Sequence, residues 1–289
     1  MNYVCRMDLQ SAYKDYLAAM AKIYERDEAE NIWKIVSEKI IAVRIHRNHY
    51  SRIILNNSQV QQLKSAQERL LRHEPIQYVI NECWFYDIPF YVDNNVLIPR
   101  PETEEIVDWV IKENKLKENL AILDVGTGSG CIPIILKRKI PAATVNSCDV
   151  SNGALAVARK NAAVHETGIH FFHIDFLNEK NRDLLPEVDV IISNPPYIPE
   201  CDKNEIRKNV LDHEPHLALF VKNEDPLIFY QAIAKFGLQR LKQKGSIYVE
   251  IHESFAEMVI QTFEQMSYST ELRKDIQGKE RMVKAFRSA

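Results

Sequence analysis

"LAILDVGTGSG", residues 120–130, decides the fold, because an apolar run gives way at once to a loop rich in glycine. The run has the length of a buried strand, and the glycines allow a tight turn in which the backbone approaches a ligand closely. Similar apolar stretches recur, with helical patterns such as 152–164 and 226–242 between several of them: "ATVNSCDV", "IHFFHID", "VDVIISN" and "GSIYVEI". Alternating strands and helices predict an α/β fold with a parallel sheet and helices on both faces.

The last part of the chain has a different pattern. "STELRKDI" and "RMVKAFR" both have the character of strands, and only "QGKE" separates them. A connection this short cannot hold a crossover helix. The stretch therefore predicts an antiparallel hairpin at an edge of the sheet.

The N-terminal part is predicted to be a separate helical domain, residues 1–77. Residues 1–74 contain neither Pro nor Gly, and their apolar residues recur at helical spacing. "SQVQQLKSAQERL" predicts a helix that is capped by Ser58. The aromatic and β-branched stretch 78–98 predicts a β-hairpin linker that turns at Asp93-Asn94-Asn95, although it could equally be the first strand pair of the second domain. Residues 99–289 are predicted to form the α/β domain.

Charge and cysteine content exclude some classes of function. Residues 1–98 hold 12 basic and 12 acidic side chains, so the net charge of −3 lies entirely in the remainder. A nucleic-acid-binding arm would be basic, so direct binding of nucleic acid is not expected.

The five cysteines form no C-x-x-C pair and the nine histidines have no ligand spacing, which predicts reduced thiols and no metal.

The sequence predicts neither a signal peptide nor a membrane-spanning helix. Its opening residues, "MNYVCRMDLQ", lack a basic stretch followed by an apolar one, and no run reaches the roughly 18 apolar residues of a membrane span. We therefore expect a cytoplasmic protein.

The glycine loop and the next strand together predict a nucleotide-like ligand. The loop has the pattern G-x-G-x-G: Gly126, Thr127, Gly128, Ser129 and Gly130. Asp149 ends the following strand, where a carboxylate accepts hydrogen bonds from ribose hydroxyls or, alternatively, caps the helix that begins near residue 152. The loop alone is also compatible with a simple tight turn. Taken together, the two features fit both S-adenosylmethionine and NAD.

"SNPPY", residues 193–197, favours S-adenosylmethionine over NAD. The prolines fix the backbone and remove two N–H donors, which leaves the carbonyl oxygens of Asn194 and Pro195 as acceptors with little freedom to move. Two fixed acceptors suit an –NH₂ group, and the ring of Tyr197 can cover the planar group that carries it. Hydride transfer needs no such arrangement. The alternative is a proline-rich turn with a surface tyrosine.

These motifs together resemble the amino-methyltransferases of the Rossmann-like, S-adenosylmethionine-dependent class. Further stretches are similar to the peptide chain release factor glutamine methyltransferases: "NVLIPRPETE" (95–104), "LDHEPHLALF" (211–220) and "KDIQGKERMVKAFR" (274–287). The resemblance implies a mostly parallel sheet with an antiparallel C-terminal hairpin, preceded by a small all-α domain that recognises the substrate. It also implies methyl transfer to the glutamine of the Gly-Gly-Gln motif in class I release factors, with S-adenosylhomocysteine as the product.

The resemblance implies a role for each site residue. The glycine loop, Asp149, Phe176 and Asn194 would bind the cofactor; Phe176 stands where the family often has tryptophan. Asn194, Pro195 and Tyr197 would act in catalysis, and with Pro196 they would bind the substrate. A monomer is expected.

Two other functions are compatible with parts of the pattern. A nucleic-acid amino-methyltransferase, acting on adenine N6 or guanine N2, would use the same Asn-Pro-Pro-Tyr motif but would need a flipped base and a basic channel. A cofactor-binding scaffold without activity is disfavoured because the motif is complete.

Overall fold

The computed structural model describes residues 7–44 and 46–287, and the chain divides into two compact units. The first runs through Asn81 and includes Lys208–His213; the second holds Glu82–Arg207 and the chain from Glu214 onward. The units differ from the expected domains in two ways. The first ends four residues later than predicted, and it includes a segment from far along the chain.

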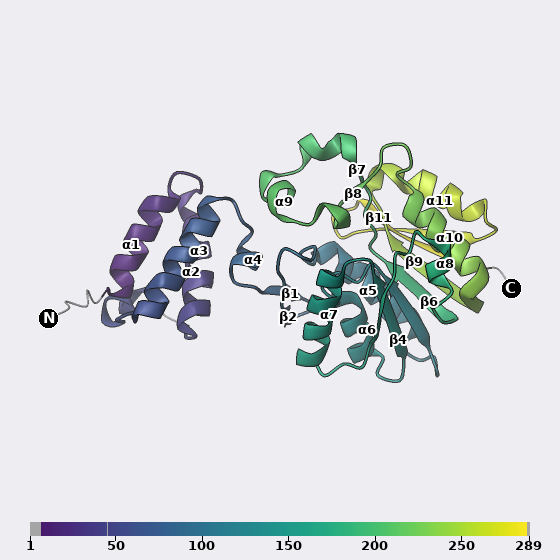
Figure 1. The fold of residues 1–289 in the computed structure, drawn as a ribbon, viewed down its shortest axis with the longest axis horizontal. Coiled ribbons are helices and arrows are strands. Elements are labelled where there is room, and N and C mark those ends of the chain that lie inside the picture. The colour runs from purple at the N-terminus through teal and green to yellow at the C-terminus, as the bar shows by residue number, and fades with distance from the viewer. Residues whose placement is uncertain (1–6, 45, 288–289) are drawn as a thin grey trace. The chain divides into compact units, whose positions relative to one another are not determined.

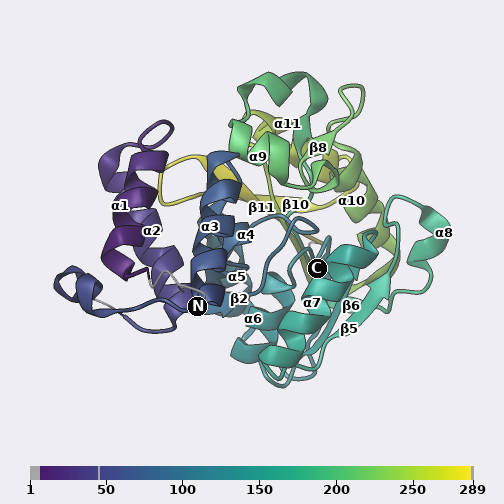
Figure 2. The same cartoon turned by 60° about the vertical axis from the view of Figure 1, so that its left-hand side comes forward.

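The first unit is a helical bundle. Its elements are α1 (Leu9–Met20), α2 (Arg26–Ile41), the 3-10 helix η1 (Arg47–Arg52), α3 (Asn57–Leu71), α4 (Ile76–Val79) and α9 (Lys208–His213). Of these, α1, α2 and α3 lie side by side (Figures 1 and 2). Four aromatic rings fill its core: Tyr13, Tyr16, Trp33 and Tyr50. The predicted cap of α3 is wrong by two residues, because Asn56, not Ser58, accepts from Gln59 N.

Arg69 closes the C-terminal end of the bundle. Its guanidinium donates to both carboxylate oxygens of Glu74, at 2.8 and 2.5 Å, and to the carbonyl oxygens of Tyr78 and Val79. A planar donor fork of this kind satisfies several acceptors at once. The short helix α4 is therefore tied to α3, which explains why the first unit extends past the expected boundary.

The second unit is built on a seven-stranded sheet in the order β10-β11-β9-β6-β3-β4-β5. Its strands are β3 (Ala121–Val125), β4 (Thr144–Asp149), β5 (His170–His173), β6 (Val188–Ser193), β9 (Leu241–Glu250), β10 (Ser269–Lys274) and β11 (Glu280–Phe286). Strands β3 to β6 and β9 pair in parallel, while β11 pairs antiparallel with β9 and β10. The predicted parallel sheet and C-terminal hairpin are confirmed, with β10 at the edge.

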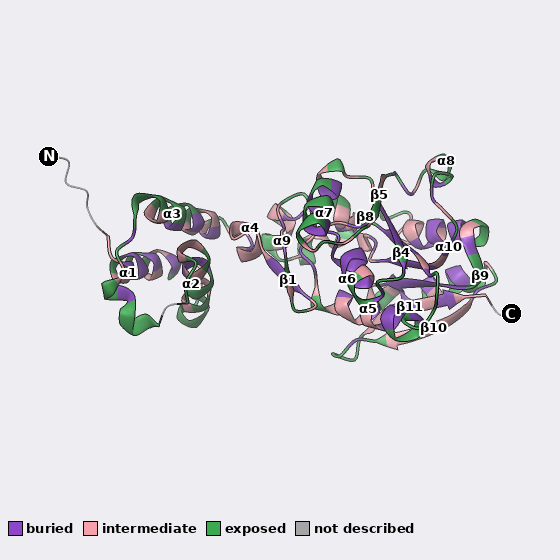
Figure 3. Ribbon diagram, turned by 90° about the horizontal axis from the view of Figure 1, so that it is seen from below, coloured by how far each residue is buried: buried purple, intermediate pink, exposed green. Residues whose placement is uncertain are grey.

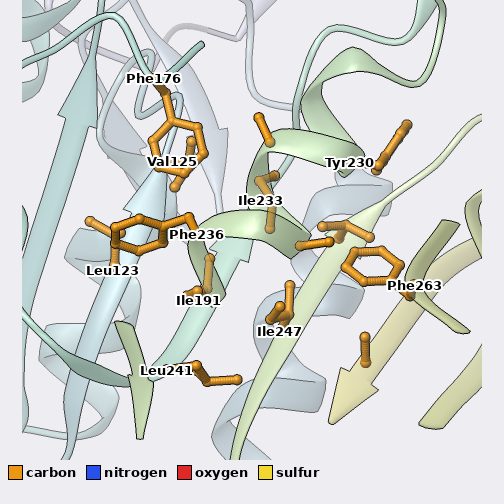
Figure 4. Close-up of a cluster of buried hydrophobic side chains, with 14 of the residues drawn as sticks. Leu123, Val125, Phe176, Ile191, Tyr230, Ile233, Phe236, Leu241, Ile247 and Phe263 are labelled. Carbon is orange, nitrogen blue, oxygen red and sulfur yellow. The ribbon is translucent and has the colours of Figure 1, made fainter. Parts of the chain in front are cut away.

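Helices cover both faces of this sheet, as predicted (Figure 1). One face packs against α5 (Pro101–Asn114), α6 (Cys131–Lys139) and α7 (Asn152–Val164), and the other against α10 (Ile228–Arg240) and α11 (Ala256–Glu264). The strands between them are largely buried (Figure 3). Figure 4 shows one of the two cores, in which Phe236 and Ile233 of α10 lie against Leu123 and Ile191 of the sheet.

The hairpin expected in the linker is present, but its predicted turn is wrong. Strands β1 (Cys83–Phe85) and β2 (Ile88–Phe90) pair antiparallel and are joined by Tyr86 and Asp87. Both joining residues have positive φ, 54° and 61°, as a two-residue hairpin turn requires. Asp93 begins a separate turn in which Val96 N donates to its carbonyl.

The remaining elements connect these layers: the strands β7 (Ile198–Pro199) and β8 (Phe220–Val221), the helix α8 (Glu179–Arg182), and the 3-10 helices η2 (Glu200–Glu205), η3 (His216–Ala218) and η4 (Glu253–Phe255). β7 and β8 pair in parallel, which brings the chain after the Asn-Pro-Pro-Tyr motif beside the chain after Pro215. Over residues 7–44 and 46–287, no helix has the length and apolar character needed to cross a membrane.

Candidate active site

A cavity of about 360 Å³ opens at the carboxyl ends of β3, β4 and β6. Ligands of open α/β sheets bind at this end of the strands. All the predicted site residues line the cavity except Gly130 and Tyr197: Gly126, Thr127, Gly128, Ser129, Asp149, Phe176, Asn194, Pro195 and Pro196. The fold thus brings together residues from four separate parts of the sequence: 126–129, 149, 176 and 194–196.

The loop after β3 leaves open space at two of its glycines. Gly126 and Gly128 have positive φ, 79° and 52°, and a Cβ placed on either would meet no atom within 4 Å. The neighbouring strand β4 fixes the loop, because Gly126 N and Thr127 N both donate to the carbonyl of Cys148. Its upper side therefore forms a shallow cradle of backbone that a ligand can approach.

Gly130 has a structural position instead of the predicted place at the cofactor. It precedes α6 with φ at 81°, and a Cβ there would lie 3.1 Å from the Cβ of Ala158 on α7. Gly130 does not line the cavity. Its missing side chain lets α6 and α7 pack closely, so the geometry gives the third glycine of the motif a packing role.

Asp149 faces the cavity from the end of β4. Its carboxylate accepts from Gly128 N at 3.0 Å and from Ser151 N at 2.8 Å. Burial raises the pKa of this carboxyl, and the bonds from Ser151 and Gly128 oppose that effect. Helix α7 is capped by Ser151, whose hydroxyl accepts from Ala154 N, so the alternative role of Asp149 as the helix cap is not needed.

Two hydroxyls of the loop that lines the cavity are poorly satisfied inside the protein. Thr127 Oγ1 and Ser129 Oγ are buried and make no hydrogen bond of normal geometry within residues 7–44 and 46–287, although the Thr127 hydroxyl is close enough to Asp124 to lower the pKa of its carboxyl. Buried polar groups in proteins nearly always have a partner. Together with the open glycine cradle, these hydroxyls fit a polar ligand such as S-adenosylmethionine.

Phe176 forms part of the wall below the loop. The residue is buried, and its ring packs edge-on against Phe236 at 5.4 Å between centroids (Figure 4). Asp175 and Leu177 on either side also line the cavity, and Asp175 is exposed there. This wall offers an apolar surface beside a carboxylate that accepts one hydrogen bond, from Leu177 N at 3.0 Å.

Asn194 is held by a side chain from another element. Its Nδ2 donates to Thr103 Oγ1 at 3.0 Å, and Thr103 in turn donates to Glu250 Oε2 at 2.7 Å. Thr103 lies in the first turn of α5, and Glu250 ends β9 beside β6. With the amide NH₂ engaged, the Oδ1 of Asn194 remains as an acceptor near the carbonyl of Pro195.

Tyr197 lies beside the cavity and does not line it. Its hydroxyl is 3.4 Å from Glu250 Oε1, and its ring lies tilted against His252 at 6.0 Å between centroids. The sequence predicted that this ring covers the planar group of the substrate, whereas Tyr197 is not among the residues that line the cavity. Its polar end belongs to the same network as Thr103.

Glu250 lies behind the cavity wall and is deeply buried, with 2% of its surface exposed. Burial raises the pKa of its carboxyl to about 7, although the bond from Thr103 and the charge of Arg281 act in the opposite direction. Burial without partners would cost a carboxylate several kcal/mol, and the short hydrogen bond from Thr103 offsets part of that cost, with a weaker contribution from the longer bond of Tyr197.

The rim of the cavity joins two of the stretches that carry the family resemblance. Arg100 Nη2 lies 2.6 Å from Glu214 Oε1, and Ile98 N donates to Glu214 Oε2 at 3.2 Å. Glu214 is 3% exposed, so this ion pair is shielded on the carboxylate side. Residues 95–100 and 215–218 are thereby fixed together as the mouth of the cavity.

Comparison with known proteins identifies the family. Residues 110–216 match the family "Methyltransferase small domain". The release factor glutamine methyltransferase of Flavobacterium psychrophilum is 42% identical over 274 residues, covering 93% of this chain and 95% of the relative. That of Bacteroides thetaiotaomicron is also 42% identical, over 81% of this chain and 84% of its own length. The chain belongs to the release factor glutamine methyltransferase family.

The fold agrees with this family. A methyltransferase of Pyrococcus furiosus superposes with a TM-score of 0.51 and covers 78% of this chain and 100% of its own, at 14% identity. Such low identity supports the fold alone. The chain is thus a methyltransferase with a Rossmann-like sheet, as the glycine loop and the Asn-Pro-Pro-Tyr motif predicted.

The sequence did not single out Thr103, Glu250 or Asp175. Glu250 ends the apolar run "SIYVE", and a charged residue at the carboxyl end of a buried strand was a usable signal for a site position. Thr103 offered no comparable signal, since a threonine in the first turn of a helix is common. Asp175 stands next to the predicted Phe176 and could have been found with it.

Proposed function

We propose that this methyltransferase transfers a methyl group from S-adenosylmethionine to the side-chain amide nitrogen of the glutamine in the Gly-Gly-Gln motif of class I peptide chain release factors. The observation that carries the proposal is the fixed amide of Asn194, whose NH₂ is bound to Thr103 so that its oxygen is left to accept. The names of the relatives support the substrate class.

The cavity has groups for each part of the cofactor. The glycine loop with Thr127 and Ser129 would hold its polar end, Asp149 its ribose hydroxyls, and Phe176 with Asp175 its adenine. When bound, S-adenosylmethionine supplies an electrophilic methyl group on a positively charged sulfur.

Asn194 and Pro195 would orient the substrate. An amide nitrogen is a poor nucleophile because its lone pair is delocalised into the carbonyl. Two carbonyl oxygens that accept its two N–H bonds align that lone pair and favour the positive charge that develops on nitrogen during attack. No strong base is needed before attack, since the proton can leave afterwards. Pro196 keeps the acceptors in place because its ring fixes the backbone.

The helical unit would bind another part of the release factor. One buried glutamine side chain gives far less contact than the roughly 800 Å² per partner of a specific protein complex. A second contact surface is therefore required, and the unit has a bundle core of its own to present one. We expect the protein to act as a monomer in the cytoplasm, where its proposed substrate takes part in translation.

A methyl-transfer assay with three acceptors tests the proposal. The protein is incubated with radiolabelled S-adenosylmethionine and, separately, a class I release factor, duplex DNA or ribosomal RNA. We expect label in the release factor only, and none in a release factor whose Gly-Gly-Gln glutamine is replaced by alanine. Label in DNA or RNA with the release factor unmodified would assign the protein to the nucleic-acid amino-methyltransferases.

A further inference from the structure

A chain of hydrogen bonds leads from the cavity into the protein interior. Asn194 Nδ2 donates to Thr103 Oγ1 at 3.0 Å, and Thr103 Oγ1 donates to Glu250 Oε2 at 2.7 Å. Tyr197 donates to the other carboxylate oxygen at 3.4 Å. The chain joins three distant segments, the start of α5, the loop after β6 and the end of β9.

The buried carboxylate of Glu250 decides which group donates and which accepts in each of these hydrogen bonds. An amide side chain can present either its oxygen or its NH₂ to a neighbour, and a hydroxyl can donate or accept. An ionised carboxylate only accepts. Burial raises the pKa of Glu250 to about 7, and above that pH the carboxylate is ionised. Thr103 must then donate inward, so its lone pair faces Asn194 and only the NH₂ of Asn194 satisfies it.

The surroundings keep the carboxylate in this position. Glu250 is 2% exposed, and the hydroxyl of Tyr230 donates to its backbone carbonyl at 3.1 Å. Arg281 bonds the neighbouring carbonyl of Ile251 at 3.2 Å and acts on the carboxylate through its charge. The end of β9 is thus fixed on both sides of the carboxylate.

We propose that Thr103 and Glu250 are positioning residues that set which end of the Asn194 amide faces the substrate. The inference rests on the proposed function, because Asn194 Oδ1 matters only if it accepts an N–H of the methylated amide. Were the Asn194 amide reversed, its NH₂ would face the substrate NH₂, two donors would meet, and the nucleophile would lose one of its two orienting acceptors.

Substitutions at Thr103 test this. Thr103→Val keeps the shape and removes the hydroxyl, whereas Thr103→Ser keeps the hydroxyl and removes the methyl. We expect Thr103→Val to lower kcat on a class I release factor by on the order of tenfold to 100-fold, the scale of a small misplacement at a reacting centre. Thr103→Ser should stay close to the parent, and neither change should alter the affinity for S-adenosylhomocysteine measured by calorimetry.

Thr262→Val is the matched control. Thr262 is also buried, but its hydroxyl donates to the carbonyl of Met258 on its own helix, α11, at 2.8 Å. It should cost stability without lowering kcat. If Thr103→Val is as active as Thr262→Val, or if Thr103→Ser loses as much as Thr103→Val, the inference is wrong. Should Thr103→Val not fold, Thr103→Ala makes the same prediction with a smaller side chain.

A double-mutant cycle separates positioning from general damage. If Thr103 acts through Asn194, Thr103→Val should lower the single-turnover rate in the parent but not further in the Asn194→Ala background. Equal losses in both backgrounds would contradict the inference. The proposed function fails differently, since the parent protein would then not methylate the release factor at all.

Discussion

The side-chain amide of Asn194 is bound to Thr103 and lines the cavity, where it can contact the substrate. Removing this side chain should therefore affect the methyl-transfer step more than the binding of the release factor. Asn194→Ala should lower the single-turnover rate on the order of 10²–10³, the cost of losing one preorganised polar contact to developing charge. Release factor affinity should change little, because most of the protein contact lies elsewhere.

Tyr197→Phe provides the comparison for that variant. It removes only the hydroxyl, whose bond to Glu250 is long at 3.4 Å, so its effect should be milder. Single-turnover rates and release factor affinities are measured for both. Near-normal turnover of saturated Asn194→Ala, or a larger loss in Tyr197→Phe, would reject the acceptor mechanism.

Asp149 provides a binding prediction. Its carboxylate faces the cavity and already accepts two backbone N–H groups, with lone pairs left for ribose hydroxyls. Asp149→Ala should weaken S-adenosylmethionine by about 1–3 kcal/mol, the cost of unpaired polar partners. The affinity of the folded variant for S-adenosylmethionine is measured by calorimetry. An unchanged affinity would show that Asp149 does not bind the ribose.

Asp124 makes stability depend on pH. It is fully buried on β3, and burial raises the pKa of its carboxyl from 3.8 to about 7, although the hydroxyl of Ser147 donates to it at 2.7 Å. Because the folded pKa is raised, the stabilisation is complete below pH 3.8 and is lost as the pH rises through about 7. Ionisation should cost on the order of a few kcal/mol.

Asp124→Asn should therefore flatten this dependence. Its side chain stays neutral, so the free energy of unfolding should fall less between pH 5 and pH 8 than it does in the parent. Glu250, whose pKa is also raised to about 7, keeps part of the slope in both proteins. Urea unfolding at the two pH values measures the difference, and identical slopes would show that Asp124 does not titrate in this range.

At the scale of the elements, the close contact between α6 and α7 depends on the absence of a side chain at Gly130. Gly130→Ala would place a Cβ 3.1 Å from Ala158 Cβ at a φ of 81°. Gly278→Ala is the matched control, with a φ of 84° and no atom within 4 Å. The left-handed conformation costs both variants about 1–2 kcal/mol, and overpacking should cost Gly130→Ala a further 1–3 kcal/mol or so. Equal unfolding free energies in the two variants would show that the helices simply move apart.

The regular elements were predictable because each carries its own periodicity. The apolar runs at β3, β4, β6 and β9 are buried on both faces, and α7 was predicted at the residues it occupies, 152–164. The turn of the first hairpin was not predictable in this way. Tyr86 and Asp87 adopt positive φ, which tyrosine rarely does, so the pairing of β1 with β2 overrides the local preference.

At the scale of the whole molecule, the sequence predicted residues that line the cavity but not Thr103 and Glu250, which hold Asn194 through hydrogen bonds. The motifs at 126–130 and 194–197 each follow a strand, and parallel strands bring their carboxyl ends together, so their meeting could be foreseen. Thr103 and Glu250 lie 147 positions apart and meet only through packing. The inclusion of residues 208–213 in the helical unit is a similar long-range effect.

The most direct test of the account is tandem mass spectrometry of a class I release factor after incubation with this protein and S-adenosylmethionine. The account predicts one added methyl group, on the peptide that contains Gly-Gly-Gln, with fragment ions that place it on the glutamine side chain. Asn194→Ala under the same conditions should leave that peptide almost unmodified. A methyl group on another residue, or an unmodified release factor in the presence of active protein, would contradict the account.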